Sequence, residues 1–163
     1  MKPAAGFPRF WPLFLLAASA VSLSSALAVS ALLRALGLIA KGSGPFPHAL
    51  RGPWITLGFA WGLLALSPVV ETFVLCVLIS LGTRLRLSPG IAVILGAFLW
   101  ASLHSMAWAP WGFIVFPAFV VFGYTFVRWR YLSFSAGFVS ATLVHVLHNV
   151  IPTAGLLLSL RGR

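Results

Sequence analysis

The chain has 163 residues, of which 61% are hydrophobic and 7% are charged. A soluble domain of this length could not solvate so apolar a surface, so the composition predicts an integral membrane protein, with residues 1–163 forming one multi-spanning domain. The net charge of +10 does not indicate nucleic-acid binding. The Lys and Arg residues lie mainly at the ends of apolar segments and in the loops, where such residues set topology and contact anionic lipids.

Apolar segments of membrane-spanning length predict about five helices. They cover residues 10–33, 54–82, 91–106, 111–127 and 132–151, and a shorter apolar segment at 152–160 is predicted to lie at the membrane interface. The first segment exceeds the roughly 7–15 apolar residues of a signal peptide, so we expect an uncleaved span. The predicted fold is an all-α, polytopic transmembrane helical bundle, a multi-pass protein of the cell membrane.

The second apolar segment is longer than a bilayer requires. As a helix it would extend about 43 Å, against a hydrocarbon core of about 30 Å. Pro68 lies inside this segment and has no backbone N–H group. We therefore expect a kink one turn before Glu71 and a carbonyl group freed at bilayer depth.

Glu71 is the only acidic residue in the chain, and it lies within this second segment. An ionisable side chain at that depth is costly, and it usually faces the bundle interior, has a partner and is functional. The candidate partners in or near apolar segments are His104, His145, His148 and Asn149. The fourth histidine, His48, is predicted to lie in the exposed loop between the first two spans.

Helical rise indicates that these polar residues share one depth. Glu71 precedes the basic turn at 84–86 by about 18 Å, and His104 follows the same turn by about 21 Å. His145 follows the second basic turn, at 128–130, by about 21 Å as well. In a five-span bundle both turns lie on one face of the membrane, so the three side chains can meet. His145, His148 and Asn149 occupy i, i+3 and i+4 and share one helix face.

The tryptophans one turn on either side of His104, Trp100 and Trp108, are predicted to line the same pocket together with His148. Each feature also has a purely structural interpretation. An isolated histidine would bond a backbone carbonyl across a helix interface, and Trp108 would belong to an interfacial aromatic belt. Glu71 would be a protonated, hydrogen-bonded structural acid. A carboxyl group and two histidines at one depth favour a site.

A site of this composition suits peptide hydrolysis, which needs an activated water, a proton donor and donors to the oxyanion. Glu71 with His104 would hold and polarise the water, and His145 with Asn149 would bind the oxyanion. Zinc bound by Glu71, His104 and His145 is the alternative, which would make the protein a metalloprotease. The HExxH spacing of zinc proteases is absent, so water activation without a metal is favoured.

At these residues the chain resembles the CPBP family (CAAX protease, Abi and bacteriocin-processing) of intramembrane endopeptidases. The family motifs P-x-x-E-E-x-x-x-R, F-x-x-x-H and H-x-x-x-N correspond to Pro68–Cys76 (PVVETFVLC), Trp100–His104 (WASLH) and His145–Asn149 (HVLHN). Order and spacing agree over about residues 60–152. The resemblance implies a hydrolase that carries out intramembrane proteolysis. It also implies Glu71 and His104 as the water-activating pair and His145 and Asn149 as oxyanion donors.

Two positions depart from the first motif. Thr72 replaces the second glutamate and Cys76 replaces the arginine, so charges that would orient Glu71 are missing. On helical geometry these side chains lie about 100° and 140° around the helix from Glu71, so neither is expected in direct contact with the site. Cys76 is the single cysteine of the chain and excludes an internal disulfide.

Three functions follow from these observations. The favoured hypothesis is a glutamate-type endopeptidase that cleaves a membrane-associated, prenylated or signal-like peptide or protein. The second is a catalytically impaired family member that acts as a membrane binding or immunity partner, which Thr72 and Cys76 favour. The third is a proton-coupled carrier. The small number of spans and the lack of an internal repeat in the sequence argue against it. In each case the bilayer is a partner, and nucleic acid is not.

Overall fold

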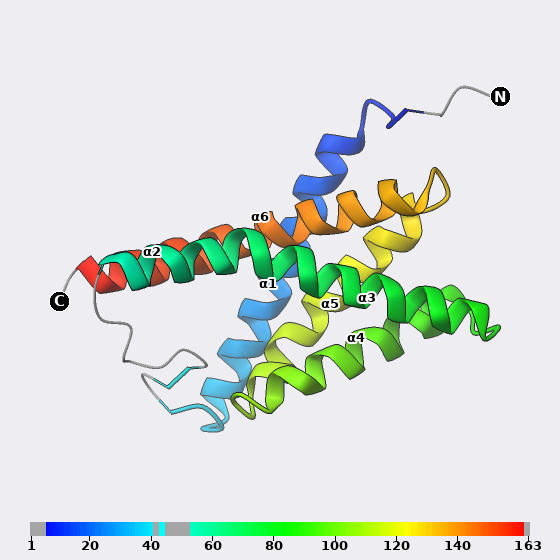
Figure 1. Ribbon diagram of the computed structural model, residues 1–163. Coiled ribbons are helices and arrows are strands. Elements are labelled where there is room, and N and C mark those ends of the chain that lie inside the picture. Colours follow the sequence, from blue (N-terminus) through cyan, green and yellow to red (C-terminus); the bar gives the residue numbers. More distant parts are fainter. Residues whose placement is uncertain (1–5, 41–42, 45–52, 162–163) are drawn as a thin grey trace.

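A computed structural model of the protein describes residues 6–40, 43–44 and 53–161 (Figure 1). Every regular element in this part of the chain is a helix, which confirms the predicted all-α class. Their order is α1 (Trp11–Ala35), α2 (Pro53–Trp61), the π-helical turn η1 (Gly62–Leu66), α3 (Ser67–Arg84), α4 (Pro89–Ser105), α5 (Trp111–Trp129) and α6 (Phe134–Arg161). The predicted loop histidine, His48, lies outside the described residues.

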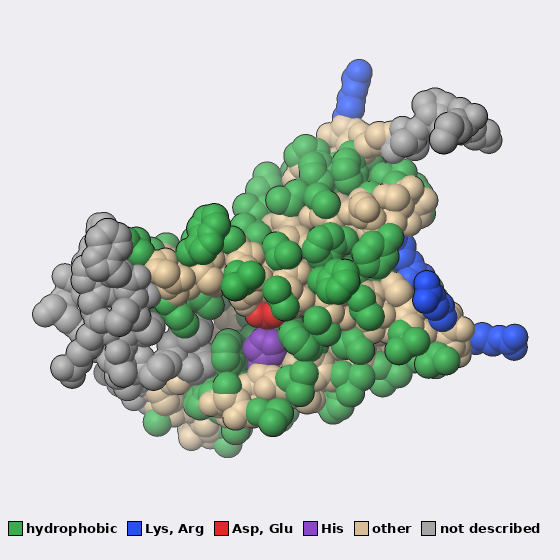
Figure 2. All heavy atoms as spheres, in the orientation of Figure 1, with side chains coloured by type: hydrophobic (Ala, Val, Ile, Leu, Met, Phe, Trp, Pro, Cys, Tyr) green, Lys and Arg blue, Asp and Glu red, His purple; other side chains and the backbone are tan. Residues whose placement is uncertain are grey.

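Among the residues that the structure describes, four helical stretches are long and apolar enough to cross a membrane, which indicates a membrane protein. They are Trp11–Ala35, Leu57–Arg84, Trp111–Trp129 and Phe134–Leu158. The third predicted span, residues 91–106, corresponds to α4, a shorter apolar helix of 17 residues, about 26 Å long. Figure 2 shows hydrophobic side chains over most of one face, with Lys and Arg at its edges, as expected of a surface that contacts lipid.

The elements α2, η1 and α3 form one long rod that bends near its middle, and α6 lies along it in the opposite direction (Figure 1). The predicted break at Pro68 takes the form of a π-helical turn. There the N–H of Ser67 donates to the carbonyl of Gly62, five residues earlier. A proline cannot supply the next helical hydrogen bond, and the wider π turn accommodates this loss without ending the helix.

The C-terminal apolar segment differs from its prediction. Residues 152–160 were expected to form a separate interfacial element after Pro152, but α6 continues through Pro152 as one helix of 28 residues to Arg161. Neighbouring helices in a membrane protein can satisfy the backbone groups that a proline frees, so the residue does not have to end a helix. The helix instead begins at a capped end, where the N–H of Ala136 donates to the hydroxyl of Ser133 at 2.9 Å.

Helix α5 lies at the centre of the bundle and contacts α1, α3, α4 and α6. Its buried face carries Phe119, Phe122 and Phe126. Small residues allow close approach: a Cβ atom on Gly123 would lie 2.9 Å from the Val93 side chain of α4. The two basic turns lie together at one end, where the Arg130 guanidinium donates to the Thr83 hydroxyl at 3.3 Å. The two turns that were predicted to share one face of the membrane thus lie at one end of the bundle.

Candidate active site

Glu71 meets two histidines from two other helices. Its Oε2 atom lies 3.3 Å from Nε2 of His104 on α4 and 4.0 Å from Nε2 of His145 on α6. The three side chains are largely buried, with 18%, 13% and 5% of their surface exposed. In Figure 2 an acidic and a histidine side chain lie next to each other within an otherwise apolar face. The convergence predicted from helical rise is therefore observed.

The second carboxylate oxygen is held from within α3. The hydroxyl of Ser67, one turn before Glu71, donates to Oε1. This leaves Oε2 to the histidines, so each oxygen has its own set of partners. The sequence analysis did not single out Ser67, although its i−4 position relative to Glu71 was a signal that could have identified it.

The hydrogen bonds of His104 determine where its proton lies. Nδ1 is 3.0 Å from the carbonyl oxygen of Trp100, and a carbonyl can only accept, so Nδ1 carries hydrogen. In a neutral imidazole Nε2 then has a lone pair, which faces Oε2 of Glu71. Contact between these two acceptors requires one more proton between them, on the carboxyl group or on the imidazole. Glu71 and His104 thus form a pair that shares a transferable proton.

His145 is oriented by Thr72, which corrects a prediction. Helical geometry placed Thr72 out of contact with the site, but its Oγ1 atom lies 3.1 Å from Nδ1 of His145. His145 approaches from α6 between the two faces of α3 that carry Glu71 and Thr72, so one ring contacts both. Cys76, the other departure from the family motif, packs in the hydrophobic core, which agrees with the prediction that it does not contact the site.

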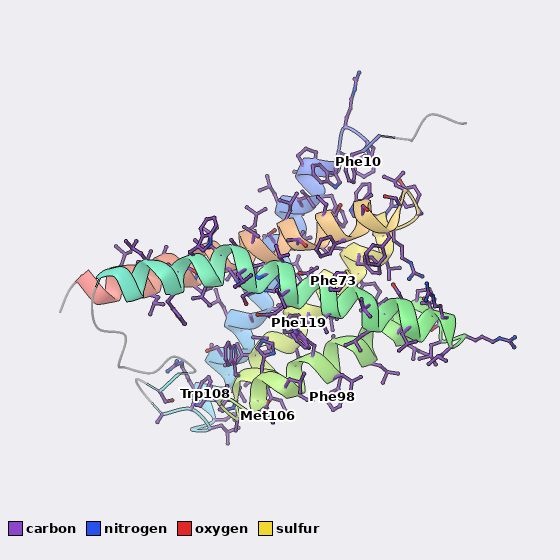
Figure 3. The ribbon with its side chains drawn as sticks, viewed as in Figure 1. Phe10, Phe73, Phe98, Met106, Trp108 and Phe119 are labelled. Atoms are coloured by element: carbon purple, nitrogen blue, oxygen red, sulfur yellow. The ribbon has the colours of Figure 1, made fainter. Side chains whose placement is uncertain are left out.

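Aromatic side chains of α5 form the wall around the histidines. Phe122 stacks on His145 with ring centroids 4.3 Å apart, and Phe119 contacts both His104 and His145. Figure 3 shows Phe119 in the middle of the bundle. The sequence analysis did not identify these residues, because nothing in the α5 sequence distinguishes them from other buried aromatics. Only the tertiary packing brings them to the histidines.

The predicted tryptophans take different positions. Trp100 contacts the edge of His104 with centroids 5.9 Å apart, but it does not line the cavity described below. Trp108 lies in the turn after α4, at the end of the bundle (Figure 3), and does not line the cavity either. Trp111, at the start of α5, packs edge-on against His104 at 5.0 Å and lines the cavity. The chain reverses after α4, so the next helix supplies the aromatic wall.

His148 and Asn149 lie beside the histidine pair but have partners of their own. Nδ1 of His148 is 3.0 Å from the hydroxyl of Ser22 on α1, which itself donates to the carbonyl of Ser19. The side-chain amide of Asn149 donates to the carbonyl of Leu63 in η1 at 2.9 Å. Both side chains line the cavity.

The polar groups surround a cavity of about 240 Å³ with mostly apolar walls. Its lining combines polar residues, among them Ser67, Glu71, His104, His145, His148 and Asn149, with apolar residues of α1, η1, α5 and α6. Such a space, apolar with a few convergent polar groups, is typical of a ligand or substrate site. It brings together all four predicted catalytic residues and one of the three predicted pocket residues, His148.

The side chains of Glu71, His104 and His145 are spaced more widely than three ligands of one tetrahedral zinc ion. Ligand atoms about 2.0–2.2 Å from a tetrahedral zinc ion lie about 3.3–3.6 Å apart. The Glu71–His104 separation of 3.3 Å matches this value, but the Glu71–His145 separation of 4.0 Å exceeds it. Within the described part of the chain, no group of three or more His, Cys, Asp or Glu side chains is placed to hold a metal ion.

Comparison with protein-family models, with curated proteins and with solved structures gave no match. The resemblance to the CPBP endopeptidases stays a prediction that rests on the three motifs.

Proposed function

We propose that this protein is a glutamate-type intramembrane endopeptidase of the cell membrane. It would hydrolyse a peptide bond in a membrane-embedded or lipidated segment. The observation that carries the proposal is the contact of Glu71, the only acidic residue in the chain, with His104 at 3.3 Å, in a cavity that is also lined by His145. Peptide hydrolysis needs a proton acceptor and donor at one point and an oxyanion donor near it, and these three residues can supply them.

The chemistry begins with a water held by Glu71 and His104. The Glu71 carboxylate accepts a proton from the water while the water oxygen attacks the scissile carbonyl carbon. The oxyanion that forms accepts a hydrogen bond from Nε2–H of His145, whose Nδ1 is engaged by Thr72. The C–N bond then breaks as the Glu71–His104 pair returns the proton to the leaving nitrogen, giving a carboxylic acid and an amine. Phe119 and Phe122 give the histidines apolar surroundings, in which each of these electrostatic interactions is stronger than in bulk water.

The test is cleavage of quenched-fluorescent peptides by the purified protein in liposomes. One set of peptides would carry a prenylated cysteine and another a signal-like apolar segment. Glu71→Gln preserves the shape of the side chain and removes its basicity, and His104→Ala removes its partner. Each is expected to lower turnover by about 10²–10⁴-fold, the usual contribution of a general acid–base. Chelation of divalent metals is expected to leave turnover unchanged, and a loss of turnover would indicate zinc.

Ser102→Ala is the matched control, because this exposed hydroxyl lies two residues before His104 and bonds only the carbonyl of Phe98 in its own helix. It is expected to retain full turnover. Retained cleavage in Glu71→Gln or His104→Ala would refute the proposal.

A second candidate is a binding or immunity partner without catalysis. Two observations favour it: Cys76 stands where the family motif has an arginine, and the Asn149 amide already donates to the Leu63 carbonyl. It predicts that the wild type cleaves no peptide and that Glu71→Gln preserves the cellular phenotype.

A further inference from the structure

The helical rod that carries Glu71 has a defect two turns before it. In the α-helical pattern the carbonyl of Leu63 would accept from the N–H of Ser67, but that N–H donates to Gly62 instead. In the π-helical pattern the donor to Leu63 would be residue 68, which is a proline and has no N–H. Neither helical pattern therefore supplies a donor to this carbonyl.

The side chain of Asn149 supplies the missing hydrogen bond. Its amide nitrogen lies 2.9 Å from the Leu63 oxygen and reaches it from α6, 86 residues along the chain. An unsatisfied carbonyl at bilayer depth is costly, so a donor from a neighbouring helix stabilises the π turn against a return to regular α-helix. The contact pins one point of the rod to α6.

Leu63, whose carbonyl binds Asn149, lies on the same side of the rod as Glu71. Leu63, Ser67 and Glu71 are spaced four residues apart, lie on one side of the rod and all line the cavity. The Ser67 hydroxyl donates a hydrogen bond to Oε1 of Glu71, so the orientation of Ser67 also affects that of the carboxylate. A π turn contains one residue more than an α turn, so its loss would rotate the residues on one side of it by about 100° relative to the other. By stabilising the π turn, the hydrogen bond of Asn149 therefore helps to set the direction in which the Ser67 and Glu71 side chains point.

We propose that Asn149 is a positioning residue, which holds the π-helical turn open through the Leu63 carbonyl and thereby directs Glu71 toward His104. This inference rests on the proposed function for its kinetic test. It differs from the role that the family motif implies for Asn149, which is direct hydrogen bonding to the oxyanion.

A double-mutant cycle with Pro68 separates the two roles. Pro68→Ala restores a backbone N–H that can donate to Leu63 in the π-helical pattern, which makes the Asn149 amide dispensable. In the wild-type background Asn149→Ala is expected to lower kcat by about 10–100-fold with KM unchanged, since a small misplacement of a catalytic group costs up to about 100-fold. In the Pro68→Ala background the same substitution is expected to cost less than about threefold. An equal loss of kcat in both backgrounds would mean that Asn149 acts on the oxyanion and would overturn the proposal.

Val150→Ala, measured in both backgrounds, controls for removal of a neighbouring α6 side chain, because Val150 is 45% exposed. Pro68→Ser provides the same N–H and is the second background if Pro68→Ala does not fold.

Thermal unfolding midpoints in detergent, measured on the same four proteins, keep the test independent of catalysis. If no variant cleaves a peptide, a smaller loss of midpoint from Asn149→Ala in the Pro68→Ala background still supports the inference while the endopeptidase proposal fails. Equal losses of midpoint in both backgrounds, again without cleavage, would overturn the inference as well.

Discussion

Replacing Thr72 by valine removes a single hydroxyl group and tests whether Thr72 orients His145. Thr72 is fully buried on α3, and its Oγ1 lies 3.1 Å from Nδ1 of His145. Valine has nearly the same shape, so the substitution leaves no cavity. The expected consequence is a buried imidazole nitrogen without a hydrogen-bond partner.

The size of the effect follows from that unpaired nitrogen. A buried polar group that loses its partner costs about 1–3 kcal/mol in free energy of unfolding. Cross-helix hydrogen bonds in membrane proteins lie at the lower end, about 0.6 kcal/mol on average and up to about 1.7, because the unfolded chain in a membrane finds other partners. His145 is 5% exposed and has little access to water. We therefore expect a loss of about 1–2 kcal/mol, a factor of about 5–30 in the ratio of folded to unfolded protein.

Reversible unfolding in mixed detergent micelles measures this loss, and two variants isolate the hydroxyl contact. Thr72→Ser keeps the hydroxyl and is expected to retain most of the stability. Thr125→Val removes an equally buried hydroxyl that bonds only the carbonyl of Val121 in its own helix. If Thr72→Val is no more destabilising than Thr125→Val, Thr72 does not hold His145 and the reasoning is refuted. In the cleavage assay Thr72→Val is also expected to lower turnover, and Thr125→Val to leave it unchanged.

Two further substitutions test the packing of the bundle. Gly112→Ala places a methyl group 2.5 Å from a backbone carbonyl of α4 and is expected to cost about 1–3 kcal/mol, whereas Gly58→Ala, with no atom within 4 Å, is expected to be neutral or stabilising in the same unfolding assay. Ser22→Ala removes the partner of His148 and is expected to cost about 1–2 kcal/mol. Its control, Ser24→Ala, removes an exposed hydroxyl that bonds only its own helix, and an equal loss in both would contradict the assigned contact.

The fold was predictable because the bilayer restricts the choice of structure. Apolar runs of spanning length must be helices when they lie in lipid, so the sequence predicts the class and the approximate bounds of each element. The error lies at a proline. Pro152 was expected to end a helix and does not, whereas the break expected at Pro68 takes the form of a π turn directly before it. The outcome at each proline depends on which neighbour can satisfy the freed backbone group, and the local sequence does not contain that information.

The candidate site was predictable in depth but not in orientation. Distance along a helix from a basic turn is a property of sequence, and it placed Glu71, His104 and His145 together correctly. Rotation about a helix axis is set by packing. The angle between Thr72 and Glu71 around α3 predicted no contact of Thr72 with the site. The ring of His145, however, reaches both Thr72 and Glu71 from α6.

The contacts around Glu71 give a physical account of how a site could operate without the charged residues of the family motif. At the position of the second glutamate, Thr72 offers His145 a hydroxyl, and one turn before Glu71, Ser67 offers the carboxylate another. Hydroxyl groups orient their partners through hydrogen bonds without placing a further charge in an apolar bundle, where each charge is costly. Cys76 offers no comparable group, since it packs in the hydrophobic core. The proton shared between Glu71 and His104 is therefore aligned by neutral donors, so isosteric removal of a hydroxyl is a sharper test of this arrangement than the introduction of the family's glutamate or arginine.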